Sequence, residues 1–250
     1  MMGREPTVVP GTLGQPLFAT THWSVVVATT NQASPQRAAA LEQLCRIYWY
    51  PIYVYVRRRG YKPEDAQDLT QEFFARLLAG QWLNKADRRR GRFRSFLLSC
   101  LNHFLTDEWH KARTAKRGGG QTLCALDDAD GEARYRQEPA DPADAERLYE
   151  RRWALILLDR VLKRLQAEFA AAGKTQLFDP LQPFLVGEKT GRTYAEMAAD
   201  LGTTEGAIKM TVLRLRQRYR ELLRDEIAQT VGAPEELEAE LRYLRSVLRG

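Results

Sequence analysis

Apolar residues recur at intervals of three and four along most of the chain, and this spacing predicts helices. The first such stretch begins near Pro35 and has apolar positions at Leu41, Leu44, Cys45, Tyr48, Ile52, Tyr55 and Val56. Pro51 interrupts it, so we expect a break or kink with Pro51 opening the next helix, which Gly60 then ends. Alternation of apolar and polar residues is not convincing anywhere, so the predicted fold class is all-α.

Two more helices follow in the first half. One opens at Pro63, with Glu64 and Asp65 in its first turn, runs through Leu78 and stops at Gly80. Its core stripe is Ala66, Leu69, Phe73 and Leu77. The other spans about Phe93 to Lys116 and ends before three consecutive glycines; it buries Phe93, Phe96, Leu97, Cys100, Leu101, Phe104 and Leu105.

The second half is separated by an acidic stretch without periodicity, residues 121–144, which contains Pro139 and Pro142. A long amphipathic helix is expected from Ala145 to just before Gly173, then a short one around Leu177 to Val186. We therefore expect five segments: a partly disordered lead-in (1–34), a helical domain (35–117), a flexible acidic linker (118–144), a second helical domain (145–232), and a tail with a final helix (233–250).

Charge is distributed unevenly along the 250 residues, whose formal net charge is +6. Between Lys85 and Arg117 there are ten Lys or Arg against three acidic residues; between Asp127 and Glu150 there are nine Asp or Glu against three Arg. A basic block followed by an acidic one favours a DNA-facing element and then a solvated linker. The three cysteines form no disulfide framework, and no signal segment or membrane-length apolar run is present, so we expect a cytoplasmic protein without membrane insertion.

The sharpest motif is TYAEMAADLGTTEGAIKMTVLRLRQRYR, residues 193–220. Thr193 and Glu196 form a capping box at a helix start, and Gly202 stands where the chain must turn with positive φ. Thr204 can cap the next helix. This is the spacing of a helix-turn-helix, whose second helix enters the major groove. That helix then exposes a basic series that suits phosphate binding: Lys209, Arg214, Arg216, Arg218, Arg220 and Arg224.

TYAEMAADLGTTEGAIK resembles the promoter −35 reading module of sigma-70-type sigma factors, in the compact extracytoplasmic-function (ECF) group. Upstream, residues 57–78 (RRRGYKPEDAQDLTQEFFARLL) are similar to the core-binding part of region 2, and residues 91–113 (GRFRSFLLSCLNHFLTDEWHKAR) to the −10 recognition helix. FATTHWSVV, residues 18–26, resembles a segment of planctomycete-type members. The resemblance implies a region 2-like bundle and a region 4-like helix-turn-helix domain joined by the acidic linker.

The resemblance also implies roles for residues of the first domain. Asp68, Gln71 and Glu72 share one helix face and, with Asp65 and Leu69, would bind core RNA polymerase. The −10 element, melted to single-stranded DNA, would be held by Arg88, Arg89, Arg90, Arg92, Arg94, Asn102, His103, Thr106 and Lys111. The loop 81–91 would shape a base pocket. Trp82 and Trp109 are stacking candidates that suit the core equally well.

For the double-stranded −35 element, the implied contacts are Thr204, Glu205, Lys209, Met210, Leu213, Arg214, Arg216 and Arg218. Met210 stands where small or polar residues are common, and Thr211 replaces a frequent arginine, so the −35 sequence is left open. Relatives are regulated by an anti-sigma factor or coupled to a Ser/Thr kinase, which makes these candidate partners. No cofactor is implied, and catalysis would belong to the polymerase.

Two alternatives compete with this interpretation. His103, Asp107 and His110 lie on one helix face at a spacing that could hold zinc in a metal-dependent hydrolase, although no His-Glu-x-x-His motif is present. The other alternative is a free-standing helix-turn-helix regulator, which would usually be a dimer and would have no role for DLTQEFF.

Overall fold

The structure, a computed structural model, describes residues 23–30, 35–79, 82–114, 131–137, 144–186 and 192–249. Within these ranges every regular element is helical, which confirms the all-α class. The first half contains α1 (Trp23–Thr30), α2 (Arg37–Arg58), α3 (Pro63–Leu78), the 3-10 turns η1 (Leu83–Lys85) and η2 (Arg88–Arg90), α4 (Phe93–Thr114) and α5 (Gly131–Arg136). The second half contains α6 (Ala145–Ala171), α7 (Thr175–Leu181), α8 (Pro183–Val186), α9 (Tyr194–Asp200), α10 (Glu205–Ala228), η3 (Pro234–Glu236) and α11 (Leu237–Arg249).

The helices α3, α4, α6 and α11 lie close to where the apolar pattern places them. The expectation at Pro51 is wrong, because α2 continues through this residue from Arg37 to Arg58. Pro51 is buried between Tyr50 and Ile52, and the packing of this stretch offsets the backbone hydrogen bond that proline cannot donate. As expected, Gly60 follows the helix with a φ of 94°.

The observed helices differ from the expected ones at two further places, where the apolar periodicity of the sequence is weak. A short helix, α5, stands inside the stretch expected to be an irregular linker, and the short helix expected around residues 177–186 is divided into α7 and α8. Glu132 of α5 accepts hydrogen bonds from Arg57 at 3.0 Å and from Tyr53 at 2.7 Å. These contacts attach α5 to α2. The triple glycine and Gly80 lie outside the described residues.

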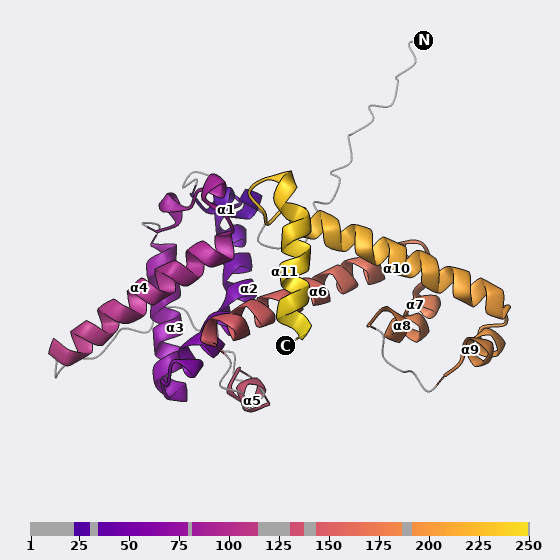
Figure 1. Cartoon of the computed structure of the whole chain (residues 1–250), viewed down its shortest axis with the longest axis horizontal. Coiled ribbons are helices and arrows are strands. Elements are labelled where there is room, and N and C mark those ends of the chain that lie inside the picture. Colours follow the sequence, from indigo (N-terminus) through magenta and orange to yellow (C-terminus); the bar gives the residue numbers. More distant parts are fainter. Residues whose placement is uncertain are drawn as a thin grey trace, which may run out of the picture.

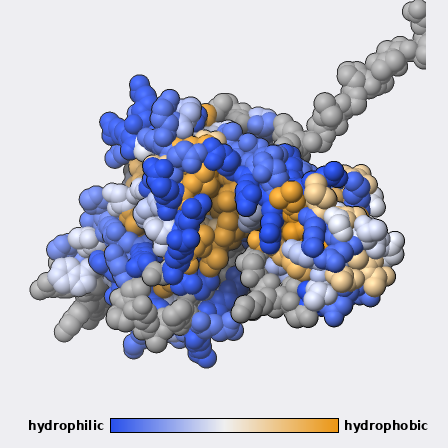
Figure 2. All heavy atoms as spheres, turned by 45° about the vertical axis from the view of Figure 1, so that its right-hand side comes forward, coloured by the Kyte–Doolittle hydropathy of each residue, from blue (hydrophilic) through white to orange (hydrophobic). Residues whose placement is uncertain are grey.

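Figure 1 shows α1 to α4 at one end of the molecule and α7 to α9 at the other, with α6 running between them and α10 running from the second end to the middle. The helix α11 crosses α6 near the middle. Within the described ranges, no helix is long and apolar enough to span a membrane. On the face in Figure 2, hydrophilic residues cover most of the surface and a hydrophobic strip shows between them.

One buried apolar cluster runs through both halves of the chain, from Trp23 and α2 to α6, α10 and α11. Tyr149 of α6 is fully buried against two aromatic rings of α2, stacking on Tyr48 at 6.5 Å and meeting Tyr55 edge-on at 6.4 Å between centroids. Its hydroxyl donates a hydrogen bond to the carbonyl oxygen of Arg94 at 3.1 Å. The two predicted domains therefore pack against each other in this structure.

The lead-in also contributes to this core. Residues 23–30 form α1, where Trp23 and Val26 are buried. Trp23 meets Phe93 edge-on, with 5.9 Å between the ring centroids, and its backbone N–H donates to the carbonyl oxygen of Gln229 at 3.3 Å. The FATTHWSVV segment, of which residues 23–26 are described, thus joins the start of α4 to the end of α10.

A buried arginine joins three helices at the centre of the molecule. Arg94 of α4 is 1% exposed and pairs with Glu150 of α6 at 2.5 Å and Glu240 of α11 at 2.6 Å. Its guanidinium also lies over the Trp153 ring, 4.3 Å from the centroid. Burial opposes the charge of Arg94, but Glu150 and Glu240 outweigh it and raise the pKa of the guanidinium. For Glu150, burial raises the pKa although Arg94 lowers it.

This cluster predicts a large stability effect from one substitution. Arg94→Met fills similar space but leaves Glu150 buried without its cation and Glu240 with Arg92 alone, so we expect a loss of about 3–5 kcal/mol in the free energy of unfolding. Urea unfolding followed by circular dichroism measures it. Arg89→Met is the matched control, since the Arg89 side chain is 90% exposed and its loss should change stability by less than about 0.5 kcal/mol. Equal midpoints for the two variants would contradict the account of the cluster.

Candidate polymerase and nucleic-acid interfaces

The helix α3 presents an acidic face to solvent. Pro63 begins the helix, and on one side Ala66, Phe73 and Leu77 are fully buried, which holds it firmly on the core. Asp65 and Asp68 are exposed on the other side. Leu69, Gln71 and Glu72 are half-buried, and Leu69 packs against the core cluster. The structure thus brings the five predicted polymerase-binding residues onto one helix, with the two aspartates most accessible.

Glu72 differs from the two aspartates because it already has a cation. Arg76 pairs with Glu72 at 2.8 Å and with Glu108 of α4 at 2.7 Å, and its guanidinium lies 4.9 Å from the centroid of the Phe104 ring. Burial opposes the charge of Glu108, but hydrogen bonds from Lys111 and Arg76 hold its pKa below the usual value. These contacts fix α3 against α4 and orient the acidic face.

A cavity of about 710 Å³ lies between the loop before α4 and the first turns of that helix. Trp82, Phe96 and Phe104 provide its aromatic lining. Lys85, Arg90, Arg92 and His103 line it together with two carboxylates, Asp87 and Asp107. Trp82 also packs on Phe73 at 5.7 Å and Phe104 at 6.3 Å, so this ring is partly core and partly cavity wall. The arrangement offers flat apolar surface beside cations, as a captured base and its phosphate require.

The five arginines expected to engage the DNA backbone have different environments. Arg89 and Arg90 are largely exposed and pair loosely with Asp87 at 3.3 and 4.0 Å. Arg88 donates to the carbonyl oxygen of Val231 at 3.2 Å, and Arg92 pairs with Glu240 at 2.6 Å. Arg94 is a correction: its guanidinium is buried among Glu150, Glu240 and Trp153, so it is not accessible to DNA in this arrangement.

The remaining −10 candidates lie along α4. Asn102 is half-buried, and its side-chain oxygen accepts a hydrogen bond from the Tyr55 hydroxyl at 2.6 Å. His103 and Thr106 are exposed, and the Thr106 hydroxyl donates to the carbonyl oxygen of Asn102 at 2.9 Å. Lys111 is exposed and pairs with Glu108 at 2.9 Å. Trp109, the other stacking candidate, is 49% exposed.

The helix-turn-helix geometry agrees with the motif. Thr193 and Glu196 form the reciprocal capping box of α9, and Thr204 caps α10 by accepting from the N–H of Ala207. Gly202 takes a φ of 63° in the turn between them. Met197 and Ala198 of α9 and Ile208 and Val212 of α10 are buried, so the two helices pack through the predicted residues.

The outward face of α10 carries an apolar pair between charged groups. Met210 is 49% exposed and Leu213 is 56% exposed, although both are large apolar residues. Glu205 and Lys209 form an exposed ion pair at 2.6 Å one turn earlier, and Arg214 is exposed beside Leu213. Thr204, Glu205, Lys209, Met210, Leu213 and Arg214 therefore share the exposed N-terminal part of α10 and its cap.

Arg216 and Arg218 of the predicted −35 set have hydrogen-bond partners within the protein. Arg216 donates from two nitrogens to the carbonyl oxygen of Phe184, at 3.1 and 2.9 Å. Arg218 forms paired hydrogen bonds with Glu168 of α6 at 2.8 and 2.9 Å. Both guanidiniums therefore hold α10 against α8 and α6 in this structure. Sequence reasoning assigned them to DNA because their internal partners are remote in sequence.

Sequence reasoning also missed Glu150 and Glu240, which neutralise Arg94 and Arg92. Both appear in the sequence as ordinary charges of amphipathic helices, and no local signal marks them as buried. The metal hypothesis gains no support, because the described residues contain no group of three His, Cys, Asp or Glu placed to hold a metal ion, and His103, Asp107 and His110 do not form one.

Residues 50–115 match the family model described as Sigma-70 region 2. The match covers the second half of α2, all of α3 and α4, and the loop between them. Over these residues the chain is similar to region 2 of sigma-70 proteins. No curated protein and no solved structure matches the chain significantly.

Alanine at two glycines of the helix-turn-helix should change the stability of the protein in opposite directions. Gly202→Ala places a Cβ in the left-handed region and should destabilise the chain by about 1 kcal/mol. Gly206→Ala lies in the first turn of α10, where an added Cβ meets nothing within 4 Å, and should stabilise it by about 0.5 kcal/mol. Thermal unfolding of both variants tests the assignment; stabilisation at position 202 would show that the turn is misplaced.

Proposed function

We propose that this chain is a sigma factor of the compact ECF type, related to planctomycete members, with a region 2-like module at α2 to α4 and a region 4-like module at α9 and α10. The match of residues 50–115 to Sigma-70 region 2 carries the proposal. The capped helix-turn-helix with its glycine turn supports the second module. Run-off transcription with purified core polymerase and genomic promoter fragments tests the function directly.

The acidic face of α3 is the proposed polymerase contact. Asp65 and Asp68 are exposed on a helix whose opposite side is fully buried, so a partner meets a rigid surface. Carboxylates and an amide on one face can accept and donate the charge-assisted hydrogen bonds that arginines of a coiled-coil partner provide. Leu69 beside them contributes apolar contact at the edge of the interface.

The cavity before α4 is the proposed site for a base of the melted −10 element. Its aromatic lining suits stacking, which contributes about 1–3 kcal/mol per base. Arg89 and Arg90 would contact phosphates beside it, and His103, Thr106 and Lys111 would continue the contact along α4. The amide nitrogen of Asn102 remains as a donor because Tyr55 engages the oxygen. This arrangement fits single-stranded DNA better than a duplex.

The start of α10 is the proposed −35 reader. Lys209 and Arg214 supply phosphate or guanine contacts. Met210 and Leu213 add an apolar surface between them, and in the major groove the complementary group for apolar side chains is the thymine methyl. We therefore propose that this surface favours thymine at the bases it meets.

A sigma factor accounts for more of the structure than the alternatives do. A free-standing helix-turn-helix regulator has no use for a rigid acidic α3 or for the cavity before α4. An enzyme would need converging catalytic groups, whereas the proposed function assigns chemistry to the polymerase. We also propose an anti-sigma factor or a Ser/Thr kinase as a partner. Because the proposed function acts on DNA, we propose that the protein is located in the cytoplasm.

Substitutions on α3 separate polymerase binding from folding. Asp68→Ala and Gln71→Ala should weaken core polymerase binding by about tenfold or more, because a hydrogen bond to a charged group contributes about 1.5–3 kcal/mol. Helical content should stay unchanged. Glu42→Ala is the control, since Glu42 is an exposed, ion-paired carboxylate on α2. Fluorescence titration with core polymerase measures the affinities; unchanged binding in both α3 variants would refute this interface.

Removing single methyl groups from the −35 element tests the apolar surface of α10. Replacing a contacted thymine by deoxyuridine should weaken holoenzyme binding by about 0.8 kcal/mol, or roughly fourfold. With holoenzyme that carries Met210→Ala or Leu213→Ala, the difference in affinity between thymine and deoxyuridine should be smaller at the base that the truncated side chain contacts. Leu155→Ala, which truncates an exposed apolar residue of α6, should retain the full difference. Equal affinity of wild type for thymine and deoxyuridine at every position would contradict thymine reading.

A further inference from the structure

The side-chain amide of Asn102 has a defined orientation on α4. Its oxygen accepts a hydrogen bond from the hydroxyl of Tyr55, which lies on α2, at 2.6 Å. An asparagine side chain carries an acceptor at one end of the amide and two donors at the other. Among the described residues, the amide nitrogen of Asn102 forms no hydrogen bond. This donor is therefore the end of the amide that is left for a ligand.

The tyrosine that orients the amide is itself held in place by the core. Tyr55 is 1% exposed, and its ring meets Tyr149 edge-on and lies 5.9 Å from the guanidinium of Arg59. Burial raises the pKa of the Tyr55 hydroxyl, so the hydroxyl keeps its proton at neutral pH and acts as a donor. A buried donor is costly to leave unpaired, which favours retention of its bond to Asn102.

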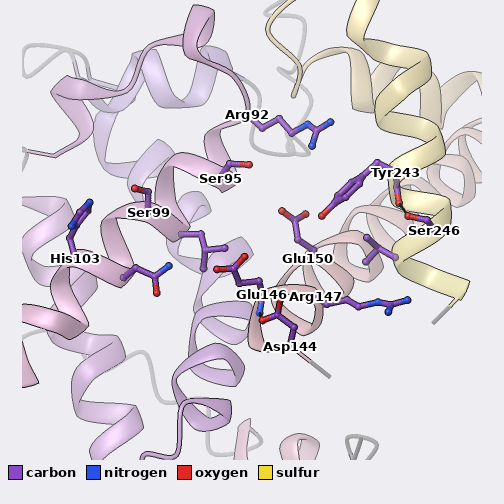
Figure 3. Close-up of a pocket in the computed structure, with 13 residues that line it drawn as sticks. Arg92, Ser95, Ser99, His103, Asp144, Glu146, Arg147, Glu150, Tyr243 and Ser246 are labelled. Atoms are coloured by element: carbon purple, nitrogen blue, oxygen red, sulfur yellow. Dashed lines mark hydrogen bonds between the residues drawn. The ribbon is translucent and has the colours of Figure 1, made fainter. Parts of the chain in front are cut away.

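The electrostatic surroundings favour the same orientation. Asn102 lines a groove of about 690 Å³ that α4 forms with the start of α6 and with α11. Figure 3 shows His103 on the α4 side of this groove, and Glu146 of α6 with Asp144 just before it on the other side. Two carboxylates attract the positive end of an amide dipole more than the negative end. They therefore favour the arrangement in which the nitrogen faces the groove and the oxygen faces the tyrosine.

A fixed donor on α4 discriminates between the bases of DNA by their exocyclic groups. Thymine and guanine carry a keto oxygen, which accepts a hydrogen bond, whereas adenine and cytosine carry an amino group, which donates one. The amide nitrogen of Asn102 would form a hydrogen bond with a keto group, but it would meet an amino group donor to donor. His103 and Thr106 beside it are exposed, so a nucleotide can reach this part of α4.

We propose that Tyr55 is a positioning residue, which makes Asn102 select a keto base, thymine or guanine, at one position of the melted −10 element. This inference rests on the proposed function and deepens it, because it names the class of base that the site reads. Tyr55 acts without touching DNA: its hydroxyl keeps the amide from turning end for end. Both residues lie within 50–115, the stretch similar to region 2.

Paired base analogues test the selection. The probes are fluorescent single-stranded oligonucleotides that carry the −10 sequence of a promoter identified by run-off transcription. At one position at a time, a pyrimidine is replaced by deoxyuridine or deoxycytidine, and a purine by deoxyinosine or deoxyadenosine, so that each pair contrasts a keto with an amino base. At one position, wild-type holoenzyme should bind the keto member about tenfold more tightly, because a hydrogen bond is gained and a donor–donor contact is avoided. Fluorescence anisotropy measures the ratio of affinities.

Substitutions at the two tyrosines of α2 identify the cause of the preference. With Tyr55→Phe the amide can present either end, so the ratio of affinities should fall to about one. Tyr53→Phe is the matched control, since it removes the same hydroxyl from the same helix, but the Tyr53 hydroxyl donates to Glu132 at 2.7 Å. Holoenzyme with Tyr53→Phe should keep the ratio of wild type.

A third variant keeps the tyrosine and does not depend on how Tyr55→Phe folds. Asn102→Asp retains an oxygen for the Tyr55 hydroxyl and replaces the amide nitrogen by a second acceptor, so the preference should invert toward the amino base. The ratio within each variant is compared, which removes the effect of the added charge on overall affinity. An unchanged keto preference in folded Tyr55→Phe, or in Asn102→Asp, would overturn the positioning role.

Failure of this inference and failure of the proposed function give different results. If wild-type chain forms holoenzyme and starts transcription, but binds the keto and amino members equally at every position, the selection of a keto base is refuted alone. If wild-type chain does not assemble with core polymerase at all, the proposed function is refuted, and the inference with it.

Discussion

A guanidinium enclosed by protein keeps its charge only when carboxylates are enclosed with it, and this requirement organises the centre of the molecule. Arg94 comes from α4, Glu150 from α6 and Glu240 from α11, so three helices distant in sequence must meet at one point. Trp153 covers the guanidinium and Tyr149 binds the backbone carbonyl of the same arginine. Because none of these groups can be left alone in the interior, the cluster ties the region 2-like helices to the C-terminal half.

The same requirement decides which basic residues are available to a nucleic acid. Arg89 and Arg90 extend into solvent beside the cavity before α4, whereas Arg92 and Arg94 meet Glu240 and Arg88 meets the turn after α10. On the second module, Lys209 and Arg214 face outward while Arg216 and Arg218 hold α10 against its neighbours. Within one basic stretch of sequence, some side chains are therefore exposed and available for binding, whereas others form contacts inside the protein.

Local signals predicted much of the fold and part of the candidate site. Pro63 with Glu64 and Asp65 marks the start of α3, and Thr193, Glu196 and Gly202 mark the helix-turn-helix, because caps and turns depend on residues only a few positions apart. The continuation of α2 through Pro51 could not be predicted in this way, since it depends on the burial of the residues around that proline. Similarly, α5 depends on Arg57 and Tyr53 of a distant helix.

By itself, the sequence determined the helical class, the boundaries of α3 and α6, the turn at Gly202 and the acidic face of α3. It also carried the similarity to Sigma-70 region 2 over residues 50–115. Only the tertiary structure decided that the two halves share a core, that Arg94 is buried, that Arg216 and Arg218 bond to other helices, and that Glu240 pairs with arginines at the start of α4. The physical reason is the range of each interaction. Helix periodicity, capping and glycine turns act within a few residues, whereas the partner of a charge is set by which distant helix packs beside it.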